Sequence, residues 1–301
     1  MKVLVSDGIH PLGEKVLRDA GLDVVMEKYD PAVLIEKIKE FDAIMVRSAT
    51  KVPKEVIDAG NLNCIARGGV GLDNIDTVYA KEKGIPVLNT PGASSISVAE
   101  LAIAHMMGVS RFLNRSNTEM REGKWPKKDY KAGREVTGKT LGLLGFGAIG
   151  RETAKRAVGL GMKVVAFDPF VTTTDMDVTI VDKDTMLAQA DFISLHMPFI
   201  KEQGPALGAA EFAKMKDGVV IINCARGGTV CEKSLLESLN NGKVDLAAID
   251  VWENEPAGEN QKALINHPNV SVTPHIGAST NEAQIRVSTE IAQKVVDALK
   301  A

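Results

Sequence analysis

Short apolar runs alternate with amphipathic stretches along the first third of the chain. The apolar runs have the pattern of strands, and stretches such as residues 12–20 and 33–39 have the pattern of helices. Strands that alternate with helices form parallel βα units, because each helix returns the chain to the same edge of the sheet. The predicted strands cover residues 2–6, 22–27, 43–46 and 64–66.

A second series of apolar runs begins near residue 139. Two such series predict two sheets, and hence an α/β fold with two doubly wound parallel-sheet domains. Periodicity leaves open on which sheet the last helix packs. The strands of the second series are predicted near Leu141, Val164, Phe192, Val219, Leu246 and Val270.

Two further helices carry capping signals. In S-V-A-E, Ser97 and Glu100 have the spacing of a capping box, which predicts a long helix from Ser97 to about Arg121. An irregular, basic stretch, residues 123–134, is expected after that helix. Ser279 and Glu282 form a second box, which predicts a final helix that reaches the C-terminus.

Composition favours a two-domain cytoplasmic protein. The chain has 301 residues, 45% of them hydrophobic, and single cores stop growing near ~250 to 300 residues. The net charge of −3 gives no electrostatic footprint for nucleic acid or an anionic membrane. The sequence holds no run of ~18 apolar residues, and its start, M-K-V-L-V-S-D, is typical of a charged strand rather than a signal peptide. We expect no nucleic-acid or membrane partner.

The cysteines predict neither a disulfide framework nor a metal site. Cys64, Cys224 and Cys231 are odd in number and lack metal-ligand spacing. Reduced thiols in the cytoplasm fit this pattern best.

A glycine-rich segment follows the first strand of the second series. Residues 141–150 read L-G-L-L-G-F-G-A-I-G, so Gly145, Gly147 and Gly150 form a G-x-G-x-x-G. The first glycine makes the turn, the second lets a pyrophosphate approach the backbone, and the third lets helix and strand pack closely. The next helix begins there and offers its amides and positive dipole end to phosphates. This order predicts a dinucleotide site.

Asp168 bears on which dinucleotide binds. It closes the next strand, K-V-V-A-F-D, at the distance of ~20 residues downstream that such a site requires. A carboxylate there accepts hydrogen bonds from the adenosine ribose hydroxyls and repels a 2′-phosphate, and Pro169, Phe170 and Val171 supply no cation. We therefore expect NAD rather than NADP, against the alternative that Asp168 merely ends a strand.

Charged side chains follow three later strands. Arg226 stands in C-A-R-G-G beside glycines expected to be flexible, Asp250 and Glu255 in D-V-W-E-N-E-P, and His275 in P-H-I-G-A-S-T. Open parallel sheets bind ligands at the carboxyl ends of their strands, so these groups are expected to converge. The alternatives are a structural ion pair for Arg226, a solvated loop acid for Glu255 and a strand-end cap for His275.

This combination suits hydride transfer between NAD and an alcohol that carries a carboxylate. The guanidinium of Arg226 can hold the carboxylate in a fork. His275 can remove or supply the hydroxyl proton, since histidine titrates near neutrality. A carboxylate at Glu255 would favour the imidazolium and fix the ring's tautomer.

The chain resembles the D-isomer-specific 2-hydroxyacid dehydrogenase family, nearly throughout and in order. The Arg, Glu and His blocks together are specific to this family, whereas the glycine motif is shared with many others. The resemblance is carried by V-R-S-A-T-K-V (residues 46–52), N-T-P-G-A-S-S-I-S-V-A-E-L (89–101), G-L-L-G-F-G-A-I-G, N-C-A-R-G-G, D-V-W-E-N-E-P and P-H-I-G-A-S-T.

The resemblance implies a division of labour along the chain. Residues 1–96 and 277–301 would form a flavodoxin-like substrate domain, into which a Rossmann-type NAD domain, residues 97–276, is inserted. Arg226, Glu255 and His275 would be catalytic, with His275 as acid and base, and the helix from Ser97 would form a homodimer. Besides the three motif glycines, cofactor contacts are implied at Val70, Ala148, Ile149, Asp168, Met197, Pro198, Cys224, Ala225, Asp250, Gly277 and Ala278.

The activity implied is NAD-dependent oxidation of D-3-phosphoglycerate to 3-phosphohydroxypyruvate, in serine biosynthesis. Arg47, beside Ser48 in the V-R-S-A-T block, would face the substrate phosphate, and Arg67 would add a second charge. Backbone amides around Gly68, Gly69 and Val70 would receive the substrate carboxylate. The alternatives within enzymes are a glyoxylate or hydroxypyruvate reductase, or another D-2-hydroxyacid dehydrogenase. A non-enzymatic alternative is an NAD-sensing corepressor-like scaffold, and the presence of Arg226, Glu255 and His275 together argues against it.

The chain departs from the family pattern in three places. Ser94 replaces a usual Asn, Cys231 interrupts a usual acidic block between Val230 and Glu232, and the loop after Pro198 lacks a common Thr. We also expect no C-terminal regulatory domain after the final helix, and hence no inhibition by serine at millimolar concentration.

Overall fold

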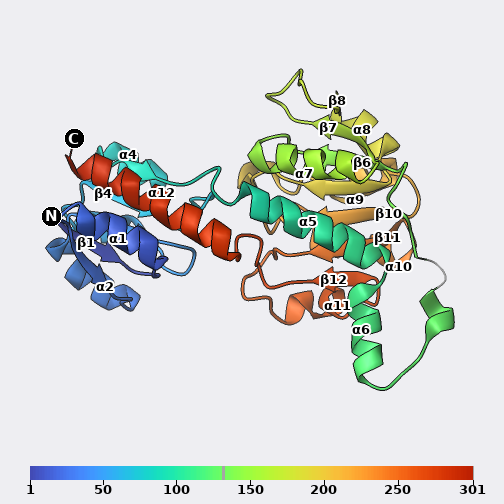
Figure 1. Cartoon of the computed structure of the whole chain (residues 1–301), viewed down its shortest axis with the longest axis horizontal. Helices are drawn as coiled ribbons and strands as arrows, with labels where there is room; N and C mark the ends of the chain where they lie inside the picture. Colours follow the sequence, from blue (N-terminus) through green and yellow to red (C-terminus); the bar gives the residue numbers. More distant parts are fainter. Residues whose placement is uncertain (131–132, 301) are drawn as a thin grey trace. The chain divides into compact units, whose positions relative to one another are not determined.

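The computed structural model describes residues 1–130 and 133–300. The chain divides into two compact units: unit 1 is Met1–Ser95 with Ala278–Ala301, and unit 2 is Ile96–Gly277. Within the described residues each unit has one sheet, of five strands in unit 1 and seven in unit 2, and every pairing is parallel. The predicted α/β fold with two doubly wound parallel sheets is confirmed (Figure 1).

In unit 1, helices cover both faces of the sheet. The strands run in the order β2-β1-β3-β4-β5 and are β1 (Lys2–Val5), β2 (Asp23–Met26), β3 (Ala43–Val46), β4 (Cys64–Arg67) and β5 (Val87–Leu88). The helices are α1 (Pro11–Asp19), α2 (Pro31–Lys37), α3 (Lys54–Ala59), α4 (Thr77–Glu82), α12 (Asn281–Lys300) and the 3₁₀ turn η1 (Ile38–Glu40).

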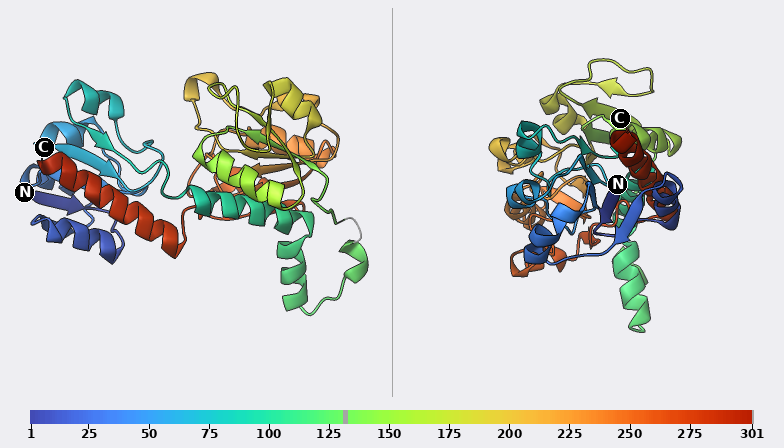
Figure 2. Two further views of the ribbon diagram at one scale, coloured as in Figure 1. Left: turned by 45° about the horizontal axis from the view of Figure 1, so that its top comes forward. Right: turned by 90° about the vertical axis from the view of Figure 1, so that its left-hand side faces the viewer.

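The last helix packs on the first sheet. Ile291 and Val295 of α12 are fully buried in one core with Val3 and Val5 of β1. Helix α12 lies along α1 (Figure 2), so close that a Cβ on Gly13 would meet the backbone oxygen of Ser288 at 2.6 Å. This contact decides the packing that periodicity left open.

In unit 2, the strand order reverses between β6 and β9. The order is β12-β11-β10-β9-β6-β7-β8, and the strands are β6 (Thr140–Leu144), β7 (Lys163–Phe167), β8 (Thr179–Ile180), β9 (Phe192–Leu195), β10 (Val219–Asn223), β11 (Val244–Ile249) and β12 (Val270–Val272). Open α/β sheets bind ligands at such a reversal, outside the carboxyl ends of the strands.

The helices of unit 2 enclose its sheet. Helices α5 and α7 bury apolar side chains on one face, and α8, α9, α10 and α11 do so on the other. The helices are α5 (Ser95–Ser110), α6 (Leu113–Arg121), α7 (Ala148–Gly159), α8 (Lys183–Gln189), α9 (Ala209–Lys214), α10 (Glu232–Asn240) and α11 (Lys262–Ile265), with 3₁₀ turns η2 (Lys127–Tyr130), η3 (Lys201–Gln203) and η4 (Glu259–Gln261).

The predicted single helix from Ser97 to Arg121 is wrong. It is two helices, α5 and α6, with a 63° bend between them. Phe112 adopts a left-handed conformation (φ 54°) at the junction, which no α-helix can continue through. Helix α6 then projects from its unit, as both views of Figure 2 show, and none of its residues is buried.

Both predicted capping boxes are also wrong. The helix begins before Ser97, whose hydroxyl donates to the carbonyl of Gly277 at 2.7 Å, and Glu100 forms an ion pair with Arg156 at 2.8 Å. At α12 the cap is Thr280, whose hydroxyl oxygen accepts from the amide of Ala283 at 3.2 Å. In each case a tertiary or neighbouring partner replaces the local one that spacing suggests.

Two short edge strands, β5 and β8, escaped the sequence pattern because each has two residues. Part of the predicted irregular stretch, residues 131–132, lies outside the described residues. In the described part of the chain no single helix is long and apolar enough to cross a membrane; only the bent pair α5 and α6 reaches that length and composition, when taken together.

Candidate active site

The glycine motif forms a tight turn from β6 into α7. Gly145 has φ +101°, and a Cβ there would lie 2.5 Å from the carbonyl oxygen of His196. A Cβ on Gly150 would lie 2.3 Å from the carbonyl oxygen of Gly145, so only glycine lets the helix pack onto the turn. At Gly147, by contrast, a Cβ would meet nothing within 4 Å. The turn therefore leaves open space at the N-terminus of α7, where Ala148 and Ile149 begin the helix.

Asp168 reaches back to this turn from the end of β7. Its Oδ2 accepts from the amide of Phe146 at 2.8 Å, and its Oδ1 accepts from the amide of Phe170 at 2.9 Å. The carboxylate is thus fixed by backbone amides and remains partly exposed. The contact of Asp168 with a ribose remains a prediction, and the position of the carboxylate beside the glycine turn is compatible with it.

The three predicted catalytic residues follow neighbouring strands. Strand β11 lies between β10 and β12, and Arg226, Glu255 and His275 lie in the segments after β10, β11 and β12 respectively. Because the strands are parallel, these segments leave the sheet at one edge, as the sequence pattern predicted. Glu255 and His275 are brought into direct contact.

His275 and Glu255 form a hydrogen-bonded pair. The Nδ1 atom of His275 lies 2.7 Å from Oε2 of Glu255, while Oε1 accepts from the amide of Trp252 at 3.1 Å. Burial would raise the pKa of Glu255, but the hydrogen bond and charge of His275, aided by Arg226, lower it overall. The His275 and Glu255 side chains are 41% and 39% exposed, so the pair faces the surface of its unit.

Arg226 is held by its own loop. Its Nη1 donates to the carbonyl of Ala225 at 2.7 Å, and its carbonyl accepts from Nδ2 of Asn223 at 3.2 Å. The glycine after it is required for close packing rather than for flexibility: a Cβ on Gly227 would lie 1.8 Å from the carbonyl oxygen of Trp252. The loop after β10 thus lies directly against the loop that carries Glu255.

Asp250 organises the turn that carries His275. Its carboxylate is buried, with the residue 1% exposed, and it accepts from the Thr273 hydroxyl at 2.6 Å and from the amides of Ile276 at 2.8 Å and Gly277 at 2.9 Å. Its carbonyl accepts from the amide of His275 at 2.8 Å. These bonds surround His275, whose φ of 55° is a left-handed conformation that is uncommon for residues other than glycine.

Behind this turn lies a polar network that the sequence did not suggest. His105 of α5 is 5% exposed; its Nε2 lies 2.9 Å from the Thr273 hydroxyl and its Nδ1 lies 3.2 Å from the Ser271 hydroxyl. Asn114 donates to the same Ser271 oxygen at 2.5 Å. A single histidine among the apolar residues of α5 was the available sequence signal.

In unit 1, the loop after β3 is held at both ends. Oδ2 of Asp7 accepts from the amides of Arg47 at 2.7 Å and Thr50 at 3.0 Å. Asn74 donates to the carbonyls of the same two residues at 2.8 and 2.5 Å. The guanidinium of Arg47 itself forms no hydrogen bond or ion pair within residues 1–130 and 133–300. Neighbouring Ser48 is exposed.

The segment after β4 only partly matches the predicted carboxylate site. Arg67 is largely buried, with Nη1 3.6 Å from Oδ2 of Asp73. The Gly68 amide donates to the carbonyl of Val46 at 2.9 Å, so it serves the sheet of unit 1 rather than a ligand. The amides of Gly69 and Val70 donate to no described residue.

The other predicted cofactor residues are placed without a partner that would test them. Met197 and Pro198 follow β9, Cys224 and Ala225 follow β10 and are buried, and Gly277 ends unit 2. Val70 and Ala278 belong to unit 1. All three cysteines are free.

The family model that matches is "D-isomer specific 2-hydroxyacid dehydrogenase, NAD binding domain", over residues 103–277. A hydroxypyruvate reductase of Thermotoga maritima is 51% identical over 91% of this chain and 90% of its own length. A D-3-phosphoglycerate dehydrogenase of Archaeoglobus fulgidus is 45% identical over 100% of this chain, which spans 58% of that relative's length.

Solved structures agree with these sequence matches. A glyoxylate reductase from Paecilomyes thermophila is similar with a TM-score of 0.90 and 31% identity, over 100% of this chain and 95% of that one. The D-lactate dehydrogenase of Aquifex aeolicus, solved with NAD and lactic acid, is similar with a TM-score of 0.86 and 28% identity, over 100% and 96%.

Proposed function

Because the chain belongs to the D-isomer specific 2-hydroxyacid dehydrogenase family, it is an NAD-dependent 2-hydroxyacid dehydrogenase, and we propose that it oxidises D-3-phosphoglycerate to 3-phosphohydroxypyruvate. The observation that carries this choice is Arg47. Its guanidinium stands on a loop held by Asp7 and Asn74 and has no anionic partner within the described residues. A guanidinium that stands on a fixed backbone and pairs with no described carboxylate is suited to a phosphate, which it binds through paired charge-assisted hydrogen bonds.

The residues at the glycine turn fit NAD. The open space at Gly147 suits a pyrophosphate, as do the first amides of α7, which helix geometry leaves without an acceptor inside the helix. Asp168 suits the adenosine ribose hydroxyls, and Pro169, Phe170 and Val171 supply no cation for a 2′-phosphate. When bound, NAD supplies the acceptor of the substrate's hydride.

The pair of His275 and Glu255 is arranged for proton transfer. Because Nδ1 of His275 is hydrogen-bonded to Glu255, Nε2 is the ring nitrogen left to take the proton from the substrate hydroxyl. Glu255, whose pKa is lowered, stays ionised and stabilises the imidazolium that forms. Arg226 would bind the substrate carboxylate and polarise the carbonyl that develops.

Reduction of hydroxypyruvate is the second candidate. It is supported by the 51% identical relative, which is named for that activity and has nearly the same length. It uses the same three residues and needs no phosphate site. The two candidates therefore differ in whether Arg47 contributes.

Turnover of matched substrates tests the choice. The purified chain would be assayed with NAD and D-3-phosphoglycerate, D-glycerate or D-lactate, and with NADH and 3-phosphohydroxypyruvate, hydroxypyruvate or glyoxylate. We expect kcat/KM for each phosphorylated acid to exceed that of its unphosphorylated counterpart about tenfold or more, since a charge-assisted contact contributes ~1.5 to 3 kcal/mol. Equal or higher kcat/KM with hydroxypyruvate would establish the second candidate instead.

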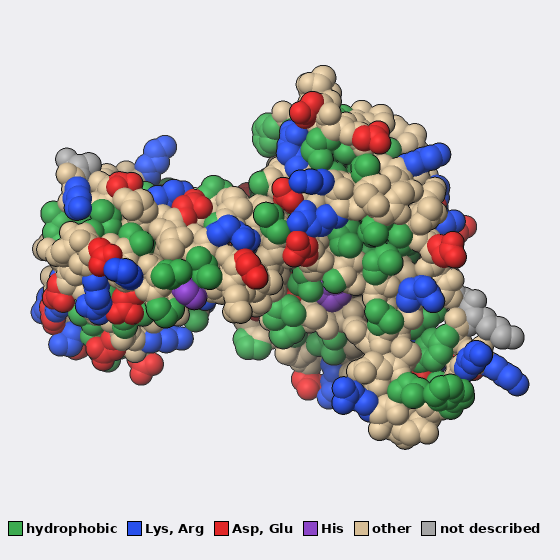
Figure 3. Space-filling model, viewed as in Figure 1, with side chains coloured by type: hydrophobic (Ala, Val, Ile, Leu, Met, Phe, Trp, Pro, Cys, Tyr) green, Lys and Arg blue, Asp and Glu red, His purple; other side chains and the backbone are tan. Residues whose placement is uncertain are grey.

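A homodimer through α5 and α6 is part of the proposal. Helix α6 buries none of its residues, and Leu113, Met120 and Trp125 expose large apolar side chains, with Trp125 77% exposed. Figure 3 shows hydrophobic side chains over α5 and around the loop that follows α6. Light scattering of the purified chain should give twice the mass of one chain. In Met120→Glu the measured mass should fall to that of a single chain. A monomeric wild-type chain at micromolar concentration would contradict this assignment.

A further inference from the structure

We propose that His105 is a positioning residue, which acts through Thr273 and Asp250 on the turn that carries His275. The polar network consists of Asn114, Ser271, His105, Thr273 and Asp250. The proposed positioning role of His105 rests on the proposed catalytic role of His275, not on the choice of substrate. Nothing in the reaction itself requires a histidine on α5.

The proton positions of the network follow by elimination. The Asp250 carboxylate can only accept, so the Thr273 hydroxyl spends its single proton on the 2.6 Å bond to it. The Thr273 oxygen must then accept from Nε2–H of His105, 2.9 Å away. The neutral ring therefore accepts at Nδ1 from the Ser271 hydroxyl, whose oxygen in turn accepts from Asn114.

Every donor in the network thus points toward Asp250. Hydrogen bonds aligned in this way polarise one another, which strengthens the last bond to the buried carboxylate. Burial lowers the pKa of His105 below its ordinary value, and the opposing charge of Asp250 does not reverse this. The ring is neutral at neutral pH, as the tautomer requires.

His105 fixes the orientation of the Thr273 hydroxyl. With Nε2–H on one side of the oxygen, the hydroxyl proton can point only to Asp250. Without that donor the hydroxyl can rotate, and the carboxylate loses one of three bonds that hold it between Thr273, Ile276 and Gly277. The left-handed residue in this turn is His275, so loosening it misplaces the proton acceptor.

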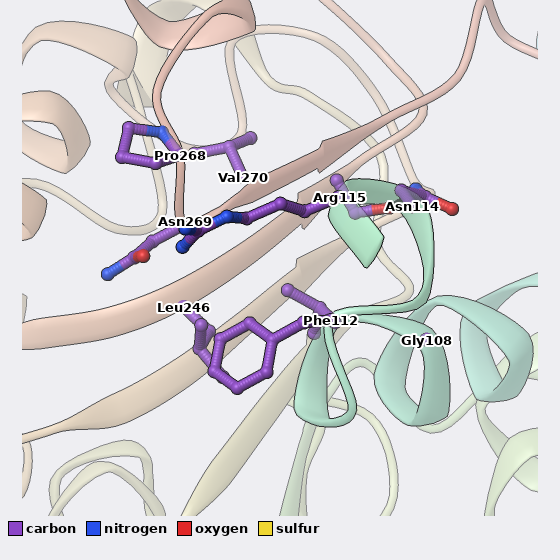
Figure 4. Close-up of a pocket in the computed structure, with 10 residues that line it drawn as sticks. Gly108, Phe112, Asn114, Arg115, Leu246, Pro268, Asn269 and Val270 are labelled. Atoms are coloured by element: carbon purple, nitrogen blue, oxygen red, sulfur yellow. Dashed lines mark hydrogen bonds between the residues drawn. The ribbon is translucent and has the colours of Figure 1, made fainter. Parts of the chain in front are cut away.

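The outer end of the network lies at the bend between α5 and α6. Asn114 follows the left-handed Phe112, and both line a small pocket with Leu246, Val270 and Ser271 (Figure 4). Asn114 is exposed, whereas His105 is buried on α5 and Ser271 on β12. The network therefore connects the helix bend to the turn at the end of β12.

Replacement of His105 separates positioning from folding. His105→Leu removes both ring nitrogens at similar volume, and His105→Gln retains a donor toward Thr273. The assay uses whichever hydroxy or keto acid the wild-type chain turns over fastest, and kcat is calculated per NADH-binding site so that only folded protein is counted. We expect kcat of His105→Leu to fall tenfold or more, with KM for the acid within about twofold of the wild-type value. His105→Gln should recover most of that kcat.

Ser110→Ala is the matched control. Ser110 is a fully buried polar residue of the same helix whose hydroxyl donates to the carbonyl of Met106, so its loss affects α5 but not the turn. Its kcat should be unchanged even where its melting temperature falls. Equal kcat in wild type and folded His105→Leu would overturn the proposal.

A double-mutant cycle with Thr273→Val tests the route. If His105 acts through the Thr273 hydroxyl, the double variant His105→Leu, Thr273→Val should have the kcat of Thr273→Val alone. Independent, multiplying losses would overturn the route. His275→Ala, assayed in parallel, keeps the two proposals apart: activity retained there overturns the role of His275 and this inference together, whereas activity lost there but not in His105→Leu overturns this inference alone.

Discussion

The two units hold their polar strand-end residues in different ways. In unit 2, Asp250 accepts from three donors and Glu255 from two, so each carboxylate is fixed by groups of the same unit. In unit 1, it is the backbone around Arg47 that is fixed, while the guanidinium has no partner within the described residues. Under the proposed function, unit 2 would carry pre-organised groups for proton transfer, and unit 1 would carry the cation that binds an anionic substrate. The proposed proton transfer and the proposed choice of acid therefore depend on different units.

The largest effect should come from unit 2. His275→Ala removes the proposed proton acceptor, and general acid–base catalysis contributes roughly 100-fold to 10,000-fold. We expect kcat to fall by that factor for every 2-hydroxy acid tested, phosphorylated or not, while NADH binding measured by fluorescence stays near that of wild type. Turnover near the wild-type rate would remove His275 from the mechanism. Glu255→Gln should have a milder effect, because it keeps the shape of the partner and loses only its charge.

Arg47→Ala in unit 1 should affect one class of substrate only. It removes a charge-assisted contact of about 1.5 to 3 kcal/mol, so KM for D-3-phosphoglycerate should rise tenfold or more. Steady-state kinetics with D-glycerate should change little. Arg47→Lys, which keeps the charge but not the fork, should lie between. Equal losses with both acids would mean that Arg47 binds the shared carboxylate or supports folding.

Acid should lower the stability of unit 2 through His196. Burial lowers the pKa of His196 to about 3, and its buried Nδ1 has no hydrogen-bond partner in the described residues. In the unfolded chain the imidazole has its ordinary pKa of ~6.5. As the pH falls below that pKa, the unfolded chain binds a proton that the folded chain does not. The free energy of unfolding therefore drops about 1.4 kcal/mol per pH unit until the pKa of the folded state is reached. Above ~6.5 this contribution is fully present.

Fluorescence can follow this loss in unit 2 alone. Both tryptophans, Trp125 and Trp252, belong to that unit. Urea unfolding followed by the emission of both tryptophans at pH 7, 6 and 5 should show the decrease in the free energy of unfolding. In His196→Gln the slope of this free energy against pH should be smaller by the contribution of one proton. An identical slope in the variant would mean that His196 does not titrate as a buried neutral ring.

The sequence predicted the sheets and the strand-end residues because both depend on local patterns. Apolar runs and a glycine turn have the same appearance in the sequence and in the fold, and parallel strands bring their carboxyl ends to one edge whatever the loops between them. The contact between Glu255 and His275 was predictable in this way. The helix bend at Phe112 was not, since it depends on one backbone conformation that the side chain does not announce.

Partners distant in sequence were beyond the pattern. Ser97 bonds to Gly277 and His105 to Thr273, over 180 and 168 positions. Spacing assigned Ser97 to a local cap and gave His105 no role, because tertiary hydrogen bonds carry no periodicity. The Gly68 amide is a similar case. It was predicted to receive the substrate carboxylate, but it donates to the carbonyl of Val46 on the neighbouring strand β3.

The smallest effect should come from Asp168 of unit 2. Its oxygens are held by the amides of Phe146 and Phe170, as the Asp250 carboxylate is held by donors of the same unit, yet the residue is partly exposed. Asp168→Asn keeps an acceptor for the glycine turn and removes the charge, so NAD binding should lose only ~0.5 to 1.5 kcal/mol, which corresponds to a rise in KM of about twofold to thirteenfold. Because repulsion of a 2′-phosphate is lost as well, KM for NADP should fall in the same variant. Steady-state KM values for both cofactors check this, with Asp168→Ala showing the added cost of a loosened turn. A wild-type chain that already uses NADP as well as NAD would show that Asp168 holds the turn and does not select the cofactor.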